Sequence, residues 1–216
     1  VTFRDYVRAL EDVEESAAFT RAREYWLDRL PDLPPAPELP LRVAPETVET
    51  ARFTSRTLQL SPEQWTRLRQ RALRNGLTPS MVLCWAYAAT LRTWSASDTF
   101  TLNVTINERL PLHPDIDRVI GEYTSQVLVA FETDEQSTVR GRITALQDRF
   151  WEDFEHRAFS GVRVLRELAR SEDGTRTTMP FVFDAVLGKD FDEADLPAWF
   201  RGMPCVSATA PQVALE

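Results

Sequence analysis

The stretch that decides the fold runs from Gly76 to Ser95 and reads GLTPSMVLCWAYAATLRTWS. Thr78 is suited to cap the free amides of a helix, and Pro79 to take its first position, because proline has no amide hydrogen to leave unpaired there. Apolar residues then occupy every side, and Arg92 is the only charge. Such a helix is either a membrane span or a core element. Its apolar run is shorter than the roughly 20 residues a bilayer requires, so we expect the central, buried helix of a globular domain.

The residues just before this helix predict a second helix and a strand. Ser61 and Gln64 form a capping box around Pro62, and the glycine at position 76 ends the helix that they open. Its inward stripe is Trp65, Leu68 and Ala72. From Arg52 to Leu60 the chain is rich in β-branched residues between proline-containing turns, which predicts a strand.

The N-terminal part of the chain predicts two short helices and a proline-rich strap. Apolar residues recur at helical spacing from Phe3 to Leu10 and, after the capping residue Ser16, from Phe19 to Leu30. Five prolines then keep residues 30–41, LPDLPPAPELPL, extended. We interpret residues 30–41 as a strap over the surface that joins the helices to the rest of the chain.

Toward the C-terminus, the segment Thr99 to Asn107 alternates cleanly between apolar and polar residues. A strand with this period places all of its polar side chains on one face. That face would carry Thr101, Asn103, Thr105 and Asn107. We therefore expect a strand with one face in the core and one polar face.

Further strands and helices follow in alternation. The pattern predicts a strand from Glu122 to Glu132, helices at Val139–His156 and Gly161–Arg170, a buried strand from Met179 to Leu187, and a last extended piece from Cys205 to Glu216. Interleaved strands and helices indicate an α/β class, with a mixed sheet flanked by helices.

Composition limits the possible partners and compartment. The chain has 216 residues and a net charge of −8, which argues against nucleic acid and anionic membranes, because clustered Lys and Arg hold both. Two cysteines, Cys84 and Cys205, give neither a disulfide framework nor a metal-binding spacing, so a cytoplasmic location fits best. The opening at Val1 with a charged amphipathic segment leads us to expect a piece of a longer polypeptide.

Generic catalytic motifs are nearly absent. We find no phosphate-binding glycine loop, metal cluster or nucleophile elbow. His113 and Asp117 have the H-x-x-x-D spacing of acyltransferases that use histidine as a general base, but an ordinary surface histidine in a loop is the alternative that we favour. His156, at the predicted end of a helix, is better explained by the C-terminal helix dipole than by catalysis.

Five segments nevertheless resemble, in order, the motifs of heterocyclization domains in nonribosomal peptide synthetases. LPDLPPAPELPL resembles LPxxPxLPL, and the stretch beginning at Leu77 resembles TPxxLxxxAYxxVLxxWS. IGEYTSQVLV, MPFVFDAVL and SATAPQVALE are similar to the segments that contain GDFTS, PVVFTS and SQTPQVWLD. The match begins after the place of the family's D-x-x-x-x-D motif.

The resemblance implies a fold and a division of the chain. It implies the C-terminal half of a condensation or heterocyclization domain, a chloramphenicol-acetyltransferase-like lobe, without its N-terminal partner. Residues 1–41 would be the helices and strap of the connection between the two lobes, and residues 42–216 the C-terminal lobe itself.

The same resemblance implies an activity for the complete domain. Such a domain condenses a carrier-bound acyl group with cysteine, serine or threonine, and then cyclises and dehydrates the product to a thiazoline or oxazoline. This chemistry requires groups that move protons and donors that stabilise an oxyanion. No cofactor is implied.

Three residues are candidates for these roles by resemblance. By resemblance, Asn103 corresponds to an asparagine of the strand matching TLNVT, which supports the catalytic residues. Asp184 stands at the position of the threonine in PVVFTS, and Glu216 at that of the aspartate in SQTPQVWLD. Replacing Thr by Asp gives an acceptor-only anion, and replacing Asp by Glu shifts the acid by one methylene. Each candidate also has a non-functional interpretation. Asp184 would be a solvated residue, Glu216 part of a frayed chain end, and Asn103 a residue that forms a hydrogen bond within the strand. Thr124 and Ser125 would be ordinary strand residues.

Two functions follow from these alternatives. In the first, which we favour, the isolated chain is a degenerate, non-catalytic half that organises neighbouring synthetase domains, such as an adenylation domain or carrier protein, or a detached N-terminal lobe. In the second it is a catalytic lobe completed by that N-terminal half. In either case we expect the polar face with Asn103, Thr105 and Asp184 to line the working surface, and self-association is a further possibility.

Overall fold

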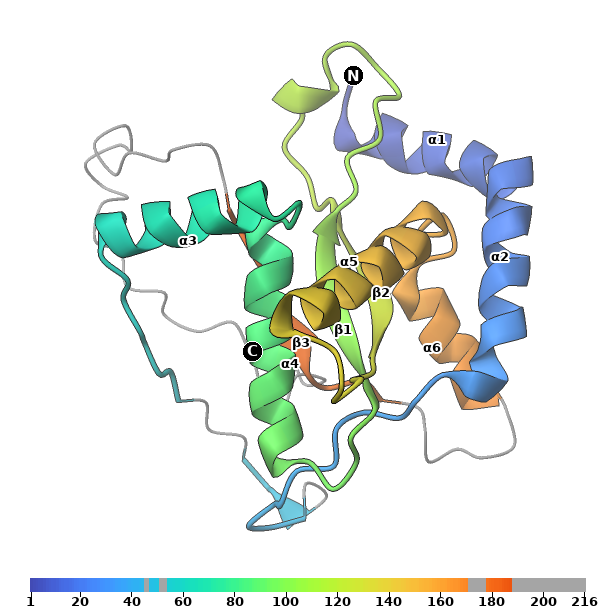
Figure 1. Ribbon diagram of the computed structural model, residues 1–216. Helices are drawn as coiled ribbons and strands as arrows, with labels where there is room; N and C mark the ends of the chain where they lie inside the picture. The colour runs from blue at the N-terminus through green and yellow to red at the C-terminus, as the bar shows by residue number, and fades with distance from the viewer. Residues whose placement is uncertain (45–46, 51–53, 171–177, 188–216) are drawn as a thin grey trace.

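The computed structural model describes residues 1–44, 47–50, 54–170 and 178–187 (Figure 1). The elements in chain order are α1 (Phe3–Glu14), α2 (Ala17–Arg29), η1 (Leu30–Asp32), α3 (Pro62–Arg74), α4 (Pro79–Trp94), β1 (Phe100–Asn107), η3 (Ile116–Arg118), β2 (Thr124–Phe131), α5 (Val139–Glu155), α6 (Gly161–Arg170) and β3 (Val182–Phe183). The expected class, α/β with a mixed sheet flanked by helices, is confirmed.

The sheet has the strand order β2-β1-β3. β1 pairs antiparallel with β2, so that Asn103 lies opposite Leu128, and parallel with β3, so that Asn103 lies opposite Val182. The expected strand from Met179 to Leu187 is only two residues long within the described part of the chain. Pro180 has no amide hydrogen for a ladder, which shortens the strand at its start.

Helix α4 begins and ends where the sequence predicts, but it is buried on one side only. Thr78 caps it, and its buried residues are Met81, Cys84, Ala88 and Leu91. Trp94 is 66% exposed, so the expectation of a helix buried all round is wrong. The reason is position, because α4 packs against α3 and α5 and leaves its remaining side open. Burial raises the pKa of the Cys84 thiol to about 12.

The local signals around α3 are confirmed, while the strand predicted before it is not. Ser61 and Gln64 make the capping box, and Gly76, with a positive φ of 73°, follows the helix end. Residues 54–60 have no regular structure and are exposed, and residues 51–53 lie outside the described residues. Strand propensity does not suffice here, because β1 has β2 on one edge and β3 with the strap on the other.

The strap, residues 30–41, lies beside the sheet instead of merely crossing the surface. The amide of Thr101 donates to the carbonyl of Pro35 at 2.8 Å, and the Thr101 hydroxyl donates to the carbonyl of Pro34 at 2.6 Å. Leu33 is buried. Proline lacks a donor but keeps its carbonyl, so the strap can accept hydrogen bonds at the edge of β1.

The largest hydrophobic core joins α2, the strap, the sheet and the helices α4, α5 and α6, while α1 and α3 contribute to two smaller clusters. Trp26 of α2 and Leu33 of the strap belong to the same buried cluster as residues of β1, β2, α4, α5 and α6. Figure 1 shows α5 crossing in front of β1 and β2, and α5 packs on β2 and α4 while α6 packs on β2 and α2. In the part of the chain that the structure describes, no helix is long and apolar enough to cross a membrane.

Candidate functional site

Asn103 lies at the centre of the sheet, between Leu128 of β2 and Val182 of β3. Its backbone amide donates to the carbonyl of Phe181 at 3.0 Å, while its side-chain Oδ1 is buried without a hydrogen-bond partner among the described residues. Only 4% of the residue is exposed. A buried polar atom with no partner costs stability, so the position calls for an explanation beyond packing.

The polar face of β1 is more closed than the sequence suggests. Thr101 and Asn103 are buried, Thr105 is half-buried, and Asn107 is exposed. Thr101 is covered because the strap accepts its hydroxyl hydrogen bond. The polar face reaches solvent only toward the carboxyl end of β1.

Asp184 follows β3 directly and is exposed. Because β3 runs parallel to β1 with Phe183 opposite Val104, the chain at Asp184 leaves the sheet toward the same end of β1 as Thr105 and Asn107. Asn103 thus lies on β1 and is buried, whereas Asp184 lies just past the neighbouring strand β3 and is exposed. Glu216, the third candidate, lies outside the described residues.

His113 takes part in a turn. Its Nδ1 accepts a hydrogen bond from the amide of Asp115 at 3.1 Å, and its side chain is largely exposed. Asp117, the other residue of the H-x-x-x-D pattern, is exposed on η3. This geometry favours the surface histidine over a general base held in a pocket. Thr124 and Ser125 lie at the start of β2 and are exposed and half-buried, respectively.

A buried charged cluster between α2 and α5 was not predicted from the sequence. Asp153 of α5 is fully buried, forms an ion pair with Arg29 of α2, and accepts a hydrogen bond from the hydroxyl of Tyr25 at 2.7 Å. Burial raises the pKa of Asp153 to about 6 and that of Tyr25 to about 12. His156 stacks on the Tyr25 ring with 3.7 Å between centroids.

This cluster is built to hold two helices together. The Trp26 indole also donates to the carbonyl of His156 at 3.1 Å, so both His156 and Asp153 are fixed by α2. The stacked position of His156 at the end of α5 agrees with the structural role we expected, and its Nδ1 lies 2.9 Å from the carbonyl of Glu152. The side chains contact one another, so we assign the cluster to stability.

A second carboxylate with a raised pKa stands just past the end of β1. Burial raises the pKa of Glu108, whose Oε1 lies 3.7 Å from Nε of Arg157. The carbonyl of Glu108 accepts a hydrogen bond from the hydroxyl of Tyr6 at 2.6 Å. A perturbed carboxyl at the open end of the polar face is a site candidate, although an ion pair of this kind also serves structure.

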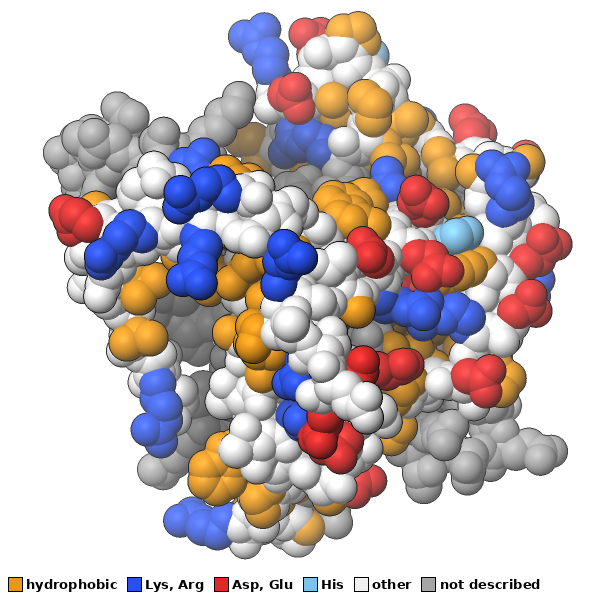
Figure 2. All heavy atoms as spheres, in the orientation of Figure 1, with side chains coloured by type: hydrophobic (Ala, Val, Ile, Leu, Met, Phe, Trp, Pro, Cys, Tyr) orange, Lys and Arg blue, Asp and Glu red, His pale blue; other side chains and the backbone are white. Residues whose placement is uncertain are grey.

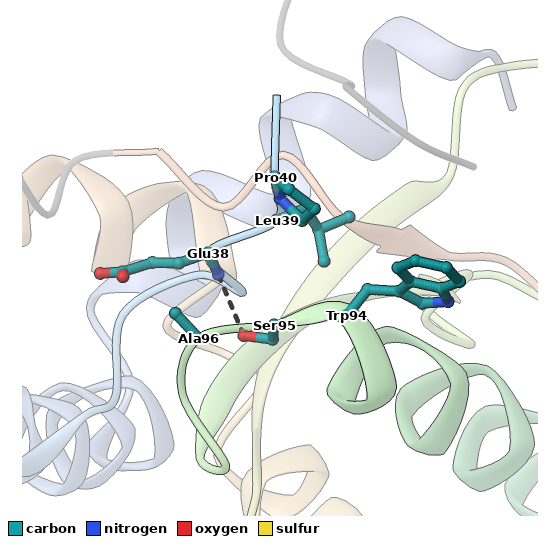
Figure 3. A pocket seen from close by; sticks show the side chains of 6 residues that line it. All are labelled: Glu38, Leu39, Pro40, Trp94, Ser95 and Ala96. Carbon is teal, nitrogen blue, oxygen red and sulfur yellow. Dashed lines mark hydrogen bonds between the residues drawn. The ribbon is translucent and has the colours of Figure 1, made fainter. Parts of the chain in front are cut away.

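The surface hollow shown in Figure 3 lies where the strap meets the end of α4. Leu39 and Pro40 stand over the turn at Ser95 and Ala96, and the indole of Trp94 lies to one side. The amide of Glu38 donates to Oγ of Ser95 at 3.2 Å. None of the predicted site residues lines this hollow, so it is separate from the face that carries Asn103.

The fold and the comparisons together define the class. The described residues form an α/β fold whose mixed sheet, in the strand order β2-β1-β3, is flanked by helices. Residues 1–198 match the family model described as Condensation domain, and the chain therefore belongs to the condensation-domain family.

The relatives that it matches include a pyochelin synthetase and a phenyloxazoline synthase. The chain is 38% identical over 187 residues to pyochelin synthetase PchF of Pseudomonas aeruginosa, covering 87% of this chain and 10% of that protein. It is 35% identical over 218 residues to phenyloxazoline synthase MbtB of Mycobacterium tuberculosis, covering 100% of this chain and 15% of that protein. The chain thus spans a small part of these relatives.

A solved structure shares the fold. The cyclization-docking bidomain of the EpoB synthetase from Sorangium cellulosum superposes with a TM-score of 0.79 at 36% identity, covering 87% of this chain and 38% of that one. The resemblance of the sequence to condensation and heterocyclization domains is therefore confirmed. The chain corresponds to part of such a domain, which agrees with the single lobe that we expected.

Proposed function

We propose that this chain is part of a heterocyclization-type condensation domain of a nonribosomal peptide synthetase, and that by itself it is non-catalytic and organises neighbouring domains. Its partners would be adenylation and carrier domains or a detached N-terminal lobe, in the cytoplasm. The names of its relatives, a pyochelin synthetase and a phenyloxazoline synthase, support the biosynthetic setting. The free, buried Cys84 fits a reducing compartment.

The observation that carries the non-catalytic role is the difference in burial between Asn103, which is 4% exposed, and the exposed Asp184. Proton transfer requires groups within hydrogen-bond reach of one reacting atom, in a site that excludes water. Here Oδ1 of Asn103 is sealed in the sheet, whereas Asp184 is an exposed acceptor at the position where the family carries a threonine. An exposed carboxylate cannot replace a hydroxyl donor at neutral pH.

Carrier proteins loaded with an acyl group and with cysteine, serine or threonine test this function. We expect no condensed or dehydrated product by intact-protein mass spectrometry when the 216-residue chain is added alone. We also expect the chain to co-sediment with an adenylation or carrier domain encoded beside it. A product lighter by one water than the condensed intermediate would contradict the proposal, as would failure to bind any neighbouring domain.

The alternative, a lobe that is catalytic when joined by an N-terminal half, is favoured by one observation. Asn103 stands at the sheet centre with its Oδ1 unpaired among the described residues, although an apolar residue would suit that environment better. In this function Asn103, Asp184 and Glu216 would face a cleft completed by the second half. Reading the coding sequence outward from Val1 for a D-x-x-x-x-D motif is the first test.

Substitution separates the two functions once an N-terminal half is supplied. If Asp184 has replaced the family threonine as a working group, Asp184→Ala should abolish cyclodehydration and Asp184→Thr should shift its pH profile. If the site is degenerate, the unsubstituted pair is inactive, and Asp184→Thr combined with Glu216→Asp is the variant expected to gain activity.

A further inference from the structure

The outward face of α3 carries a stripe of arginines on a protein that is acidic overall. Arg67, Arg71 and Arg74 follow one another at spacings of four and three, so they lie on one face of the helix. The opposite face carries the half-buried Trp65 and Leu68 and the buried Ala72. Figure 2 shows Lys and Arg side chains gathered over α3 with few acidic ones among them. We call Arg67, Arg71 and Arg74 the arginine stripe.

The arginine stripe is not neutralised within the described part of the chain. The ion pairs found there involve other arginines, such as Arg92 with Asp98 and Arg149 with Glu152. Nε of Arg74 donates to the backbone carbonyl of Gln70 at 3.3 Å, which leaves its charge unpaired by a carboxylate among these residues. The three guanidinium groups are exposed and keep their charge available to a partner.

Helix stability does not explain the whole stripe. Arg71 and Arg74 lie in the last turn, where cations interact favourably with the helix dipole. Arg67 lies in the middle of α3, and like charges three or four residues apart repel one another and destabilise a helix. A helix that serves only as a cover for α4 would not need a cation at this position.

We propose that the arginine stripe docks a helix of a partner protein that presents Asp or Glu at spacings of four and three. Guanidinium groups pair with carboxylates in forked geometry, and two helices can align such rows along their axes. A surface hollow lined by Pro62, Glu63, Thr66 and Arg67 lies at one end of the stripe and can accept a side chain from the partner. This surface rests on the proposed function, because it supplies one contact by which the chain organises a neighbouring domain.

Two other occupants fit the arginine stripe less well. Nucleic acid needs a wide positive field, whereas the net charge of the chain is −8 and the stripe is confined to one helix. A second copy of the chain could offer the acidic end of α1, Glu11, Asp12 and Glu15. Those three residues stand at spacings of one and three, and Glu15 follows the end of α1, so they do not match the row that the stripe would pair with.

Binding of a designed helical peptide tests the docking surface directly. The probe is a fluorescent peptide with the pattern E-x-x-x-E-x-x-E, and its control has Gln at the three Glu positions. We expect the Glu peptide to bind the 216-residue chain, and binding to weaken between about 0.05 and 0.5 M salt because the contacts are exposed ion pairs. The triple variant Arg67→Gln, Arg71→Gln, Arg74→Gln should bind roughly tenfold more weakly.

A matched variant separates the stripe from net charge. The triple variant Arg4→Gln, Arg8→Gln, Arg23→Gln removes the same charge from exposed positions on α1 and α2 and should bind the peptide as the unmodified chain does. The stripe variant should shift its unfolding midpoint little, because the loss of the Arg74 hydrogen bond and of the helix-dipole interactions is offset by the relief of repulsion among the three charges.

Several outcomes would overturn the proposal. They are equal binding of the Glu and Gln peptides, equal loss in the two triple variants, tighter binding of a short DNA duplex than of the peptide, and self-association that the stripe variant abolishes. The peptide assay involves no carrier-bound substrate, so its failure leaves the proposed function standing. A chain that binds the peptide but no synthetase domain would retain the surface and lose the proposed function.

Discussion

At the residue scale, the most informative group is the buried carboxylate of Asp153, whose burial disfavours its charged form. Asp153 is fully buried, and burial raises its pKa to about 6 even though Arg29 and Tyr25 both contact it. Desolvation of a carboxylate therefore outweighs the ion pair. Its Oδ2 has no hydrogen-bond partner among the described residues, which is the structural reason.

The raised pKa of Asp153 predicts a pH dependence of stability. The folded chain binds this proton up to about pH 6, while the unfolded chain releases it near the ordinary value of 3.8. Its contribution is therefore fully present below about pH 4 and is lost as the pH rises through about 6, a change of about 3 kcal/mol. We expect the difference in unfolding free energy between the unmodified chain and Asp153→Asn to fall by that amount from pH 4 to pH 7. Parallel urea-unfolding curves for the two chains over this range would contradict it.

Replacing Asn103 by an apolar residue should increase the stability of the chain. Oδ1 is buried between two apolar neighbours and has no partner in the part of the chain that the structure describes, so Asn103→Leu should raise the unfolding free energy by roughly 1 to 2 kcal/mol. Thr101→Val, on the same face of β1, is the control, since it removes the hydroxyl that donates to the Pro34 carbonyl and should cost about 1 kcal/mol. If chemical denaturation shows Asn103→Leu to be the more damaging change, then Asn103 serves the fold and not a site.

Residue patterns revealed Asn103 but not Asp153. Asn103 stands out because a period of two isolates it on a polar face and a family strand matches it. Asp153 lies on the buried face of α5 together with Leu146 and Phe150. A charged residue on an otherwise apolar helix face was the feature of the sequence that could have indicated a buried ion pair. Its partner Arg29 lies 124 positions away in the chain, and no local pattern joins the two.

At the scale of elements, caps and turns followed local chemistry, while strand extent depended on neighbours. The termini of α3 and α4 are set by Ser61, Gln64, Thr78 and Gly76, which act on adjacent backbone. The segment from Arg52 to Leu60 has β-strand propensity, but its described residues, 54–60, form no strand. The strap contains several prolines, and it nevertheless accepts a backbone hydrogen bond from Thr101 of β1. Helix ends are thus predictable from a few residues, whereas ladders require knowledge of which edges meet.

Alanine substitutions at two glycines should have opposite effects on stability, because only Gly161 lies at the close contact between α6 and β2. A Cβ at Gly161 would lie 2.8 Å from the backbone carbonyl oxygen of Gln126, so Gly161→Ala must push α6 away from β2 and should cost roughly 1 to 3 kcal/mol. A Cβ at Gly141 in α5 would approach the side-chain Oγ of Ser137 too closely, but this atom can rotate away, and the next atom, Oγ1 of Thr138 at 3.5 Å, is at ordinary contact distance. Alanine there should be neutral or stabilise by up to about 1 kcal/mol, because glycine is a poor helix former.

Thermal unfolding of the two alanine variants checks the contact. Gly161→Ala should lower the midpoint, and Gly141→Ala should leave it unchanged or raise it. An equal loss in both would mean that helix propensity and not the close approach to Gln126 decides the outcome.

At the scale of the whole molecule, the N-terminal segment is tied to the lobe by more than sequence proximity. Trp26 is only 1% exposed and belongs to the core that contains β1, β2, α4, α5 and α6. The ion pair of Arg29 with Asp153 and the hydrogen bonds of the strap with Thr101 add polar contacts across the same boundary. Residues 1–41, expected as an inter-lobe connection, thus supply part of the core.

This shared core predicts one unfolding transition and a lobe that depends on residues 1–41. Circular dichroism and tryptophan fluorescence should report the same urea midpoint, because no separate core exists in α2 to unfold first. Trp26→Ala should lower the unfolding free energy by roughly 3 to 5 kcal/mol, and a chain of residues 42–216 should lose its cooperative transition. Arg4→Gln, at an exposed position on α1, is the control and should change little. If residues 42–216 unfold cooperatively on their own, the core contacts of Trp26 and Leu33 are not required for folding. The N-terminal helices would then be a separate segment and not part of the core of the lobe.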